Sequence, residues 1–166
     1  ATSLATVTLH DSMTSIADSS FNGCSSLSTI ALPKMLTTIG TNSFTATNIS
    51  ELTIYDKVTT IKSSAFNTNT IKTVEFTGTT EPTCDSSVFT TSVTEVKVPI
   101  GYTSSAFCGK IPRSDGNCGN QCTFKYYHNN DKIITTGEMT DFTSTSKPEW
   151  NIQMSNIKTI EIKESS

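Results

Sequence analysis

Residues 27–44 read LSTIALPKMLTTIGTNSF, and the chain repeats the apolar spacing of this stretch on both sides of it. The later part of the stretch has the frame Leu32-x3-Leu36-x2-Ile39-x4-Phe44. The same frame occurs 23 residues earlier, as Leu9-x3-Met13-x2-Ile16-x4-Phe21, and 22 residues later, as Ile54-x3-Val58-x2-Ile61-x4-Phe66. A period of this length predicts a solenoid of stacked coils.

A shorter apolar frame opens each coil and marks the expected strand. In residues 27–44 it is Leu27-x2-Ile30-x-Leu32, and it recurs as Leu4-x2-Val7-x-Leu9, Ile49-x2-Leu52-x-Ile54, Ile71-x2-Val74-x-Phe76 and Val93-x2-Val96-x-Val98, which gives five coils. An L-x-x-L-x-L core at this period is typical of leucine-rich repeats, in which each coil adds one parallel strand to a curved sheet. We therefore expect a β-rich leucine-rich-repeat solenoid of right-handed parallel coils, because a lone coil could not bury its apolar side.

The second half of each coil resembles the BspA-like leucine-rich repeat, also called the Treponema pallidum type. The hallmark of that family is the run I-P-x-x-V-T-x-I-G-x-x-A-F-x-x-C, and this chain has Val58-Thr59-Thr60-Ile61 followed by Ala65-Phe66. It departs from the run in that the proline occurs only as Pro33, the glycine only as Gly40 and the terminal cysteine only as Cys24. The apolar frame persists through these departures, so the resemblance implies the same solenoid and extends over nearly the whole chain.

The x positions of each frame predict an outward surface, because successive side chains of a strand point to opposite faces. Threonine is common there, as expected for a β-branched residue on a pleated surface. Glu75 and Lys97 occupy matching positions on adjacent strands and are expected to form a cross-strand pair. Tyr55 follows the third strand and is our choice for a binding hot spot. The candidate binding residues are Thr6, Thr29, Glu51, Thr53, Tyr55, Thr73, Glu75, Glu95 and Lys97.

Three segments are predicted along the chain. Residues 1–112 form the array and its terminal cap, to which Tyr102 and Phe107 are expected to contribute apolar cover. Residues 113–156 comprise a linker, placed where Pro, Gly, Asp and Asn are frequent, and a C-terminal β-hairpin cap module. This module resembles the amino-terminal cap of a following array. Residues 157–166 repeat the strand frame and would be the first strand of a further repeat; no signal peptide precedes Ala1, so we expect a segment of a longer protein.

Four cysteines lie close together around the end of the array: Cys84, Cys108, Cys118 and Cys122. In a chain rich in serine and threonine they predict two disulfide bonds and an extracellular or cell-surface location. Cys84–Cys108 with Cys118–Cys122 is our preferred pairing among the three that four cysteines allow. A zinc site formed by Cys118-x3-Cys122 with His128 and Cys108 is the alternative, although a second closely spaced ligand pair is missing. Cys24 stands apart and is expected to be a buried free thiol.

Composition and motifs exclude several classes of function. The net charge of -3 and the pI of about 5.3 provide no electrostatic attraction to nucleic acid. No apolar run approaches the roughly 18 residues of a membrane-spanning helix. The sequence has two histidines and no G-x-S-x-G motif, P-loop, dinucleotide fingerprint or EF-hand loop. We therefore expect no catalytic residues, no cofactor, no metal site and no membrane insertion.

The resemblance implies a non-catalytic cell-surface or secreted module for adhesion or protein recognition, with the repeat sheet as its binding face. Its expected partners are extracellular proteins such as host matrix proteins or cell-surface receptors. The alternative is a structural spacer, or a filament subunit that associates head to tail and has no ligand of its own. Asn48-Ile49-Ser50 is an N-x-S sequon, which makes Asn48 a candidate glycosylation site in a secreted eukaryotic protein.

Overall fold

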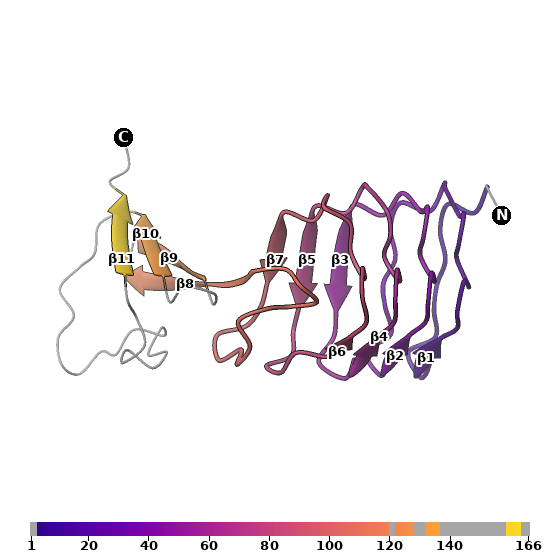
Figure 1. The fold of residues 1–166 in the computed structure, drawn as a ribbon, viewed down its shortest axis with the longest axis horizontal. Helices are drawn as coiled ribbons and strands as arrows, with labels where there is room; N and C mark the ends of the chain where they lie inside the picture. The colour runs from indigo at the N-terminus through magenta and orange to yellow at the C-terminus, as the bar shows by residue number, and fades with distance from the viewer. Residues whose placement is uncertain (1–2, 120–121, 128–131, 137–158, 164–166) are drawn as a thin grey trace.

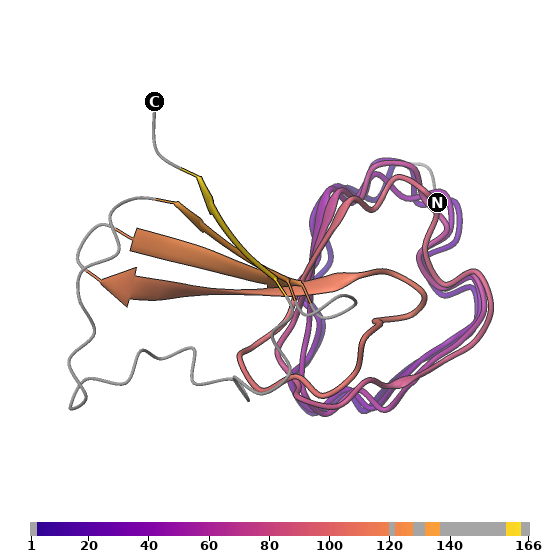
Figure 2. The ribbon, with the colours of Figure 1, turned by 60° about the vertical axis from the view of Figure 1, so that its left-hand side comes forward.

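The computed structural model describes residues 3–119, 122–127, 132–136 and 159–163, and the side chains of residues 3–115. This part of the chain consists of strands, turns and loops, and no helix occurs in it. Figure 1 shows the coils stacked side by side along one axis, and Figure 2 shows them superimposed in outline when the view turns toward that axis. The predicted solenoid is therefore confirmed.

One parallel sheet comes from the Ile-x4-Phe part of the repeat. Its strands are β1 (Ser15–Ile16), β2 (Thr38–Ile39), β4 (Thr60–Ile61) and β6 (Thr83–Cys84), in the order β1-β2-β4-β6. The register aligns Ile16, Ile39, Ile61 and Cys84, so the fourth coil carries a cysteine where the first three carry isoleucine. Each strand has only two residues, because the coil turns again immediately toward the phenylalanine.

The second sheet comes from the shorter frame. Its first three strands are β3 (Glu51–Ile54), β5 (Thr73–Phe76) and β7 (Glu95–Lys97), all parallel, with Leu52, Val74 and Val96 in register. The sheet continues through β8 (Pro112–Gly119), β9 (Cys122–Tyr127), β10 (Lys132–Thr136) and β11 (Thr159–Lys163). In Figure 1 these later strands lie beyond the stack, at the end opposite the N-terminus.

The strands expected at residues 4–9 and 27–32 are not formed, which corrects the prediction for the first two coils. The middle residues of their frames, Val7 and Ile30, are only half-buried, whereas the corresponding Leu52 is buried. Strand pairing is thus confined to the coils in which the middle of the frame is packed against the core.

A ladder of phenylalanines runs through the core. Phe21, Phe44, Phe66 and Phe89 stack in sequence, with ring centroids 5.1, 5.2 and 5.5 Å apart and nearly parallel planes. Offset stacks of this kind add roughly 0.5–1.5 kcal/mol per pair to the free energy gained by burial. The frame Ile-x4-Phe therefore places an aromatic residue at the same point of every coil. Cys24 is buried beside this core as a free thiol, as predicted.

Threonine hydroxyls connect successive coils, a role that the surface pattern did not reveal. Thr37 Oγ1 donates to the Thr14 carbonyl at 2.9 Å, and Thr68 Oγ1 donates to the Thr47 carbonyl at 2.7 Å. Thr90 Oγ1 makes the next such bond, to the Thr68 carbonyl at 2.8 Å. Much of the Ser/Thr content thus satisfies carbonyls of the neighbouring coil in addition to facing water.

The tight turn before each phenylalanine needs a left-handed residue, and the chain uses the same position each time. Ser19, Asn42, Ser64 and Ser87 have φ between 54° and 59°. Gly40 is required for a different reason, because a Cβ there would lie 2.6 Å from the Ala17 backbone of the preceding coil. The glycine of the family hallmark is thus kept at a close approach of two coils.

The C-terminal end of the array is sealed as predicted. Phe107 is fully buried with its ring centroid 4.9 Å from that of Phe76, and buried Tyr102 meets the same ring edge-on at 6.1 Å. Tyr102 Oη donates to the Ala106 carbonyl at 2.7 Å. Burial raises the pKa of the Tyr102 phenol, and the Glu81 carboxylate raises it further.

Residues 112–119 form strand β8, where a linker was expected. The start of β8 pairs parallel with β7, aligning Val96 with Pro112, and the rest pairs antiparallel with β9. Pro112 is the first residue of the strand, where a missing N–H is tolerated, and the register shifts near Gly119, as at a β-bulge. The composition of this segment predicted an interruption of secondary structure, but the free edge of β7 gives its backbone a hydrogen-bonding partner.

Strands β9 and β10 pair antiparallel over the residues predicted to form the hairpin. Strand β11 pairs parallel with β10 and contains Ile160 and Ile162 of the repeated frame. Whether this module caps a further array remains a prediction, and residues 137–158 of it lie outside the described residues.

Candidate functional site

The outward face of the second sheet has the predicted register. Glu51, Thr73 and Glu95 form one row across β3, β5 and β7, and Thr53, Glu75 and Lys97 form the other. Residues of the two rows are exposed or half-buried, while the intervening Leu52, Val74 and Val96 are buried. Six of the nine candidate residues are therefore brought together on one surface, which we call the strand face.

The other three candidates lie apart from these rows. Thr6 and Thr29 are exposed, but they belong to the first two coils, whose frames are not strands. Tyr55 follows β3 and is half-buried; the Lys34 Nζ of the preceding coil lies 5.9 Å from its ring centroid. A cation at this distance is attracted to the aromatic face. Tyr55 thus lies at the margin where the strands end.

Charge on the strand face is concentrated around Arg113, which lies in the predicted linker and was not among the candidate residues. Arg113 lies in β8, is 7% exposed and pairs with Glu95 of β7 and with Asp115 of its own strand. Thr73 Oγ1 also donates to Glu95, at 3.3 Å. The position of Arg113 beside Glu95 depends on the parallel pairing of β7 and β8.

These contacts change the acidity of both groups. Partial burial raises the pKa of the Glu95 carboxyl, but the hydrogen bond and positive charge of Arg113, with help from Lys97, outweigh it and hold the pKa below its ordinary value. Burial lowers the pKa of Arg113, and its bonds to Glu95 and Asp115 raise the net value above the ordinary one. Both groups are therefore charged at neutral pH and are already paired.

The expected pair between Glu75 and Lys97 is only partly right. The two residues are register partners, but the Lys97 ammonium lies 3.9 Å from Glu95 of its own strand, and this is its ion pair. Lys97 therefore pairs along its strand, with Glu95, and not across to β5. Glu75, like Glu51, makes no ion pair with another described side chain, so these two carboxylates are the unpaired charges of the strand face.

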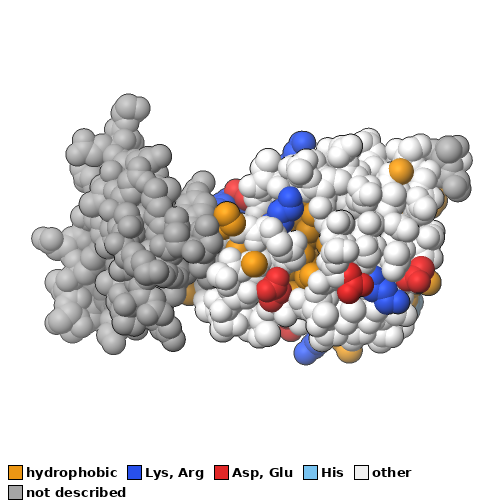
Figure 3. Space-filling model, in the orientation of Figure 1, with side chains coloured by type: hydrophobic (Ala, Val, Ile, Leu, Met, Phe, Trp, Pro, Cys, Tyr) orange, Lys and Arg blue, Asp and Glu red, His pale blue; other side chains and the backbone are white. Residues whose placement is uncertain are grey.

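The surface offers little concavity. Figure 3 shows that most of the visible surface of the coils is neither charged nor hydrophobic, with isolated acidic and basic side chains. A hollow of about 180 Å³ lies beside Glu75, Lys97 and Pro99 on the strand face. Among residues 3–115 no three His, Cys, Asp or Glu side chains are placed to hold a metal ion. Such a face suits contact with a broad partner more than enclosure of a small ligand.

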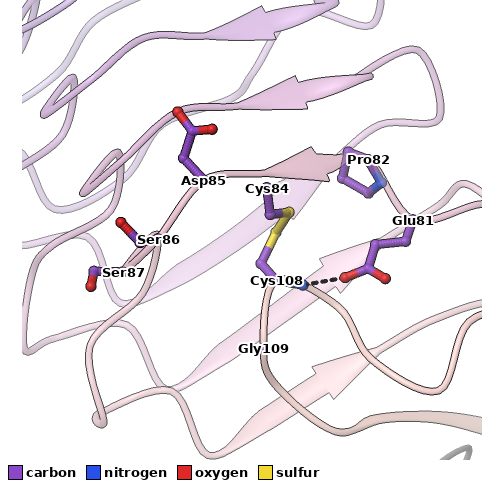
Figure 4. A pocket seen from close by; sticks show the side chains of 8 residues that line it. All are labelled: Glu81, Pro82, Cys84, Asp85, Ser86, Ser87, Cys108 and Gly109. Atoms are coloured by element: carbon purple, nitrogen blue, oxygen red, sulfur yellow. Dashed lines mark hydrogen bonds between the residues drawn. A yellow bond between two sulfur atoms is a disulfide. The ribbon is translucent and has the colours of Figure 1, made fainter.

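A larger hollow, of about 440 Å³, surrounds the predicted disulfide between Cys84 and Cys108. Figure 4 shows Glu81 on one side of this bond and Asp85, Ser86 and Ser87 on the other. The Cys108 N–H donates to Glu81 Oε1 at 2.8 Å, and Ser104 Oγ donates to Glu81 Oε2 at 2.7 Å. Both oxygens of Glu81 therefore hold the cap loop, which makes this hollow a structural junction.

The structure also bears on the alternative zinc site, the second disulfide and the candidate glycosylation site. Cys108 is consumed by its disulfide and is not available as a thiolate ligand in the alternative zinc site. The side chains of Cys118 and Cys122 lie outside the described residues, so their pairing stays a prediction. Asn48 is exposed. In the described part of the chain there is no helix long and apolar enough to cross a bilayer.

Comparison with known proteins agrees with this geometry. Residues 1–112 match the BspA type leucine rich repeat region, with six copies, one more than the five frames counted in the sequence. No curated protein matches the chain. The match covers more than half of the chain and the same residues that form the coils, so the chain belongs to the BspA-type leucine-rich repeat family.

Proposed function

We propose that this chain is a non-catalytic recognition module of a cell-surface or secreted protein, and that the strand face binds an extracellular protein partner. The observation that carries the proposal is the in-register display of Glu51, Thr73 and Glu95 beside Thr53, Glu75 and Lys97 over a buried core. A rigid, extended surface without a deep pocket is typical of repeat proteins that bind other proteins. The Cys84–Cys108 disulfide supports an oxidising, extracellular location.

The unpaired charges of the strand face indicate which substitutions test the proposal. Glu51 and Glu75 are exposed and belong to adjacent strands, whereas Glu95 is engaged by Arg113. Reversing Glu51 and Glu75 to lysine changes the face without removing an internal contact. Reversing Glu95 would also leave Arg113 unpaired and is unsuitable.

Binding of the labelled chain to fibronectin, to other matrix proteins and to host cells should be measured for the wild type and for Glu51→Lys/Glu75→Lys. We expect a loss of at least about tenfold in affinity, mainly through the association rate and dependent on salt. The matched control is Asp11→Lys/Asp85→Lys, which makes the same charge change at exposed positions away from the strand face. Equal binding by all three proteins would contradict use of this face.

A second function, as a spacer or head-to-tail filament subunit, is favoured by the difference between the ends of the array. Tyr102 and Phe107 seal one end, whereas Leu4, Val7 and Phe21 at the other are only half-buried. Unequal ends allow a heterologous contact that propagates. Light scattering of the chain over a wide concentration range distinguishes this function, since a strictly monomeric species at high concentration would rule out the filament.

A further inference from the structure

Asn48 occupies a coil position that later coils fill with a hydroxyl side chain. Thr70, one coil later, donates its hydroxyl to the Ile49 carbonyl of the preceding coil at 2.5 Å, and Ser92 makes a bond of the same kind at 3.1 Å. Asn48 keeps only a backbone contact, from its N–H to the Leu27 carbonyl at 2.9 Å. Its side-chain amide is exposed and bonds to no other residue among 3–115. Asn48 therefore takes no part in the side-chain hydrogen bonds that connect successive coils.

The conformation of residues 48–50 presents the acceptor and the hydroxyl residue of the sequon to solvent. Ile49 is fully buried and anchors the segment, while Asn48 and Ser50 on either side of it are exposed. The acceptor amide and the hydroxyl that defines the sequon are thus accessible together. The sequence contains no other N-x-S or N-x-T with a residue other than proline between.

We propose that Asn48 carries an N-linked oligosaccharide in the mature protein. The donor is of the class of lipid-linked oligosaccharide pyrophosphates, which serve asparagine in N-x-S sequons of secreted proteins. The Asn48 side-chain nitrogen bonds to the anomeric carbon, the bond from that carbon to the pyrophosphate oxygen breaks, and the amide proton passes to a base of the transferase. The lipid pyrophosphate is the leaving group, and no redox partner is needed.

The glycan occupies one margin of the strand face. Asn48 precedes β3 and Tyr55 follows it, so roughly 20 Å of extended chain separates them at about 3.3 Å per residue. The oligosaccharide covers the side where the coils enter the sheet, next to Ser26 and Thr70 of the adjacent coils. The side near Tyr55, and the charged residues of β5 and β7, stay open to a partner. This directs recognition toward the C-terminal coils.

This inference rests on the extracellular location proposed above, and one peptide map of the full-length protein from its native source tests both. The digest is analysed without reduction, before and after treatment with a peptide N-glycosidase, which converts a glycosylated asparagine to aspartate. We expect a glycopeptide that contains residue 48 and a linked pair of peptides that contains Cys84 and Cys108. The linked pair reports passage through an oxidising compartment independently of the sugar.

The outcomes separate the two proposals. An intact Cys84–Cys108 bond with unmodified Asn48 overturns the glycan and leaves the location standing. Reduced cysteines with unmodified Asn48 overturn both.

Two variants expressed in the same source check the assignment. Asn48→Thr introduces a hydroxyl of the kind that connects the later coils, and Ser50→Ala breaks the sequon but keeps the acceptor asparagine. Both should lose the glycan completely and still secrete as folded protein; a glycan retained on Ser50→Ala contradicts sequon-dependent transfer.

Discussion

The two ends of the array differ in how their last coil is covered. At the C-terminal end, Tyr102 and Phe107 pack on Phe76, a disulfide fixes the loop and Glu81 holds it with both oxygens. At the N-terminal end, the frame residues of the first coil are half-buried and form no strand. Coils in a solenoid are stabilised by their neighbours, so regular structure is weaker where, among the described residues, the frame side chains are less completely buried. The following substitutions measure that difference.

Removing a rung of the phenylalanine ladder should have the largest effect, and the effect should depend on its place. Phe66→Ala removes a fully buried ring that stacks on both sides and should cost about 3–5 kcal/mol of unfolding free energy. Phe21→Ala removes a half-buried ring stacked on one side and should cost about half of that. Urea denaturation followed by circular dichroism measures both. Equal losses would mean that the end coil is as well supported as the centre.

Opening the disulfide should weaken the sealed end next. The bond joins residues 24 apart, so Cys84→Ser/Cys108→Ser should lower the unfolding free energy by about 3 kcal/mol, mainly through the unfolded state. Wild-type protein in reductant should match the variant. Cys24→Ala, which changes a free thiol, is the control whose response to reductant should equal that of the wild type. If reductant leaves wild-type stability unchanged, the bond does not support the cap.

Ser43→Ala should stabilise the protein by about 1 kcal/mol, because the buried Ser43 hydroxyl has no hydrogen-bond partner. Ala65 fills the same position in the next coil. The matched change in the outer coil, Ser20→Ala, removes an exposed bond to the Ala17 carbonyl and should be neutral or slightly destabilising. Thermal melts of the two variants compare interior with end directly. A destabilised Ser43→Ala would indicate that the hydroxyl has a partner after all.

The smallest expected effect is a pH dependence near the sealed end. The pKa of Glu95 is lowered in the folded state, so its contribution to stability is present above the ordinary glutamate pKa and is lost as pH falls through the lowered value. Partial solvent exposure limits the size of the contribution to below about 1 kcal/mol. Stability measured from neutral to acidic pH should fall less steeply for Glu95→Gln than for the wild type. Parallel curves would show that the Arg113 contact adds no net stability.

Much of this structure could be predicted from spacing alone. The frame around Leu52 places Thr53 and Glu51 outward, and the register of β3, β5 and β7 follows from the constant period. The predicted cap residue Phe107 and the Cys84–Cys108 bond are also present. The outward residues and the strand register depend on contacts between the same positions of successive coils, which a repeating sequence states directly. The cap and the disulfide were inferred instead from the end of the repeat and from the clustering of the cysteines.

Other features depend on contacts between unlike segments, and spacing does not encode them. The pairing of β8 with β7 forms a strand although the sequence of β8 is rich in turn-favouring residues, and it brings Arg113 to Glu95. The failure of the first two frames to become strands likewise depends on how tightly Val7 and Ile30 are packed. Local composition is a weak guide where a neighbouring edge offers hydrogen bonds.

The amino-acid sequence by itself determined the coil, its period, its inward and outward residues and the family to which the chain belongs. Hydrophobic spacing suffices for these because burial of one apolar side is the condition for a coil to exist. Only the tertiary structure decided which frames become strands, which charges are already paired and which hydroxyls connect coils. Those outcomes depend on distances between atoms of different coils, and two chains with the same frame can differ in every one of them.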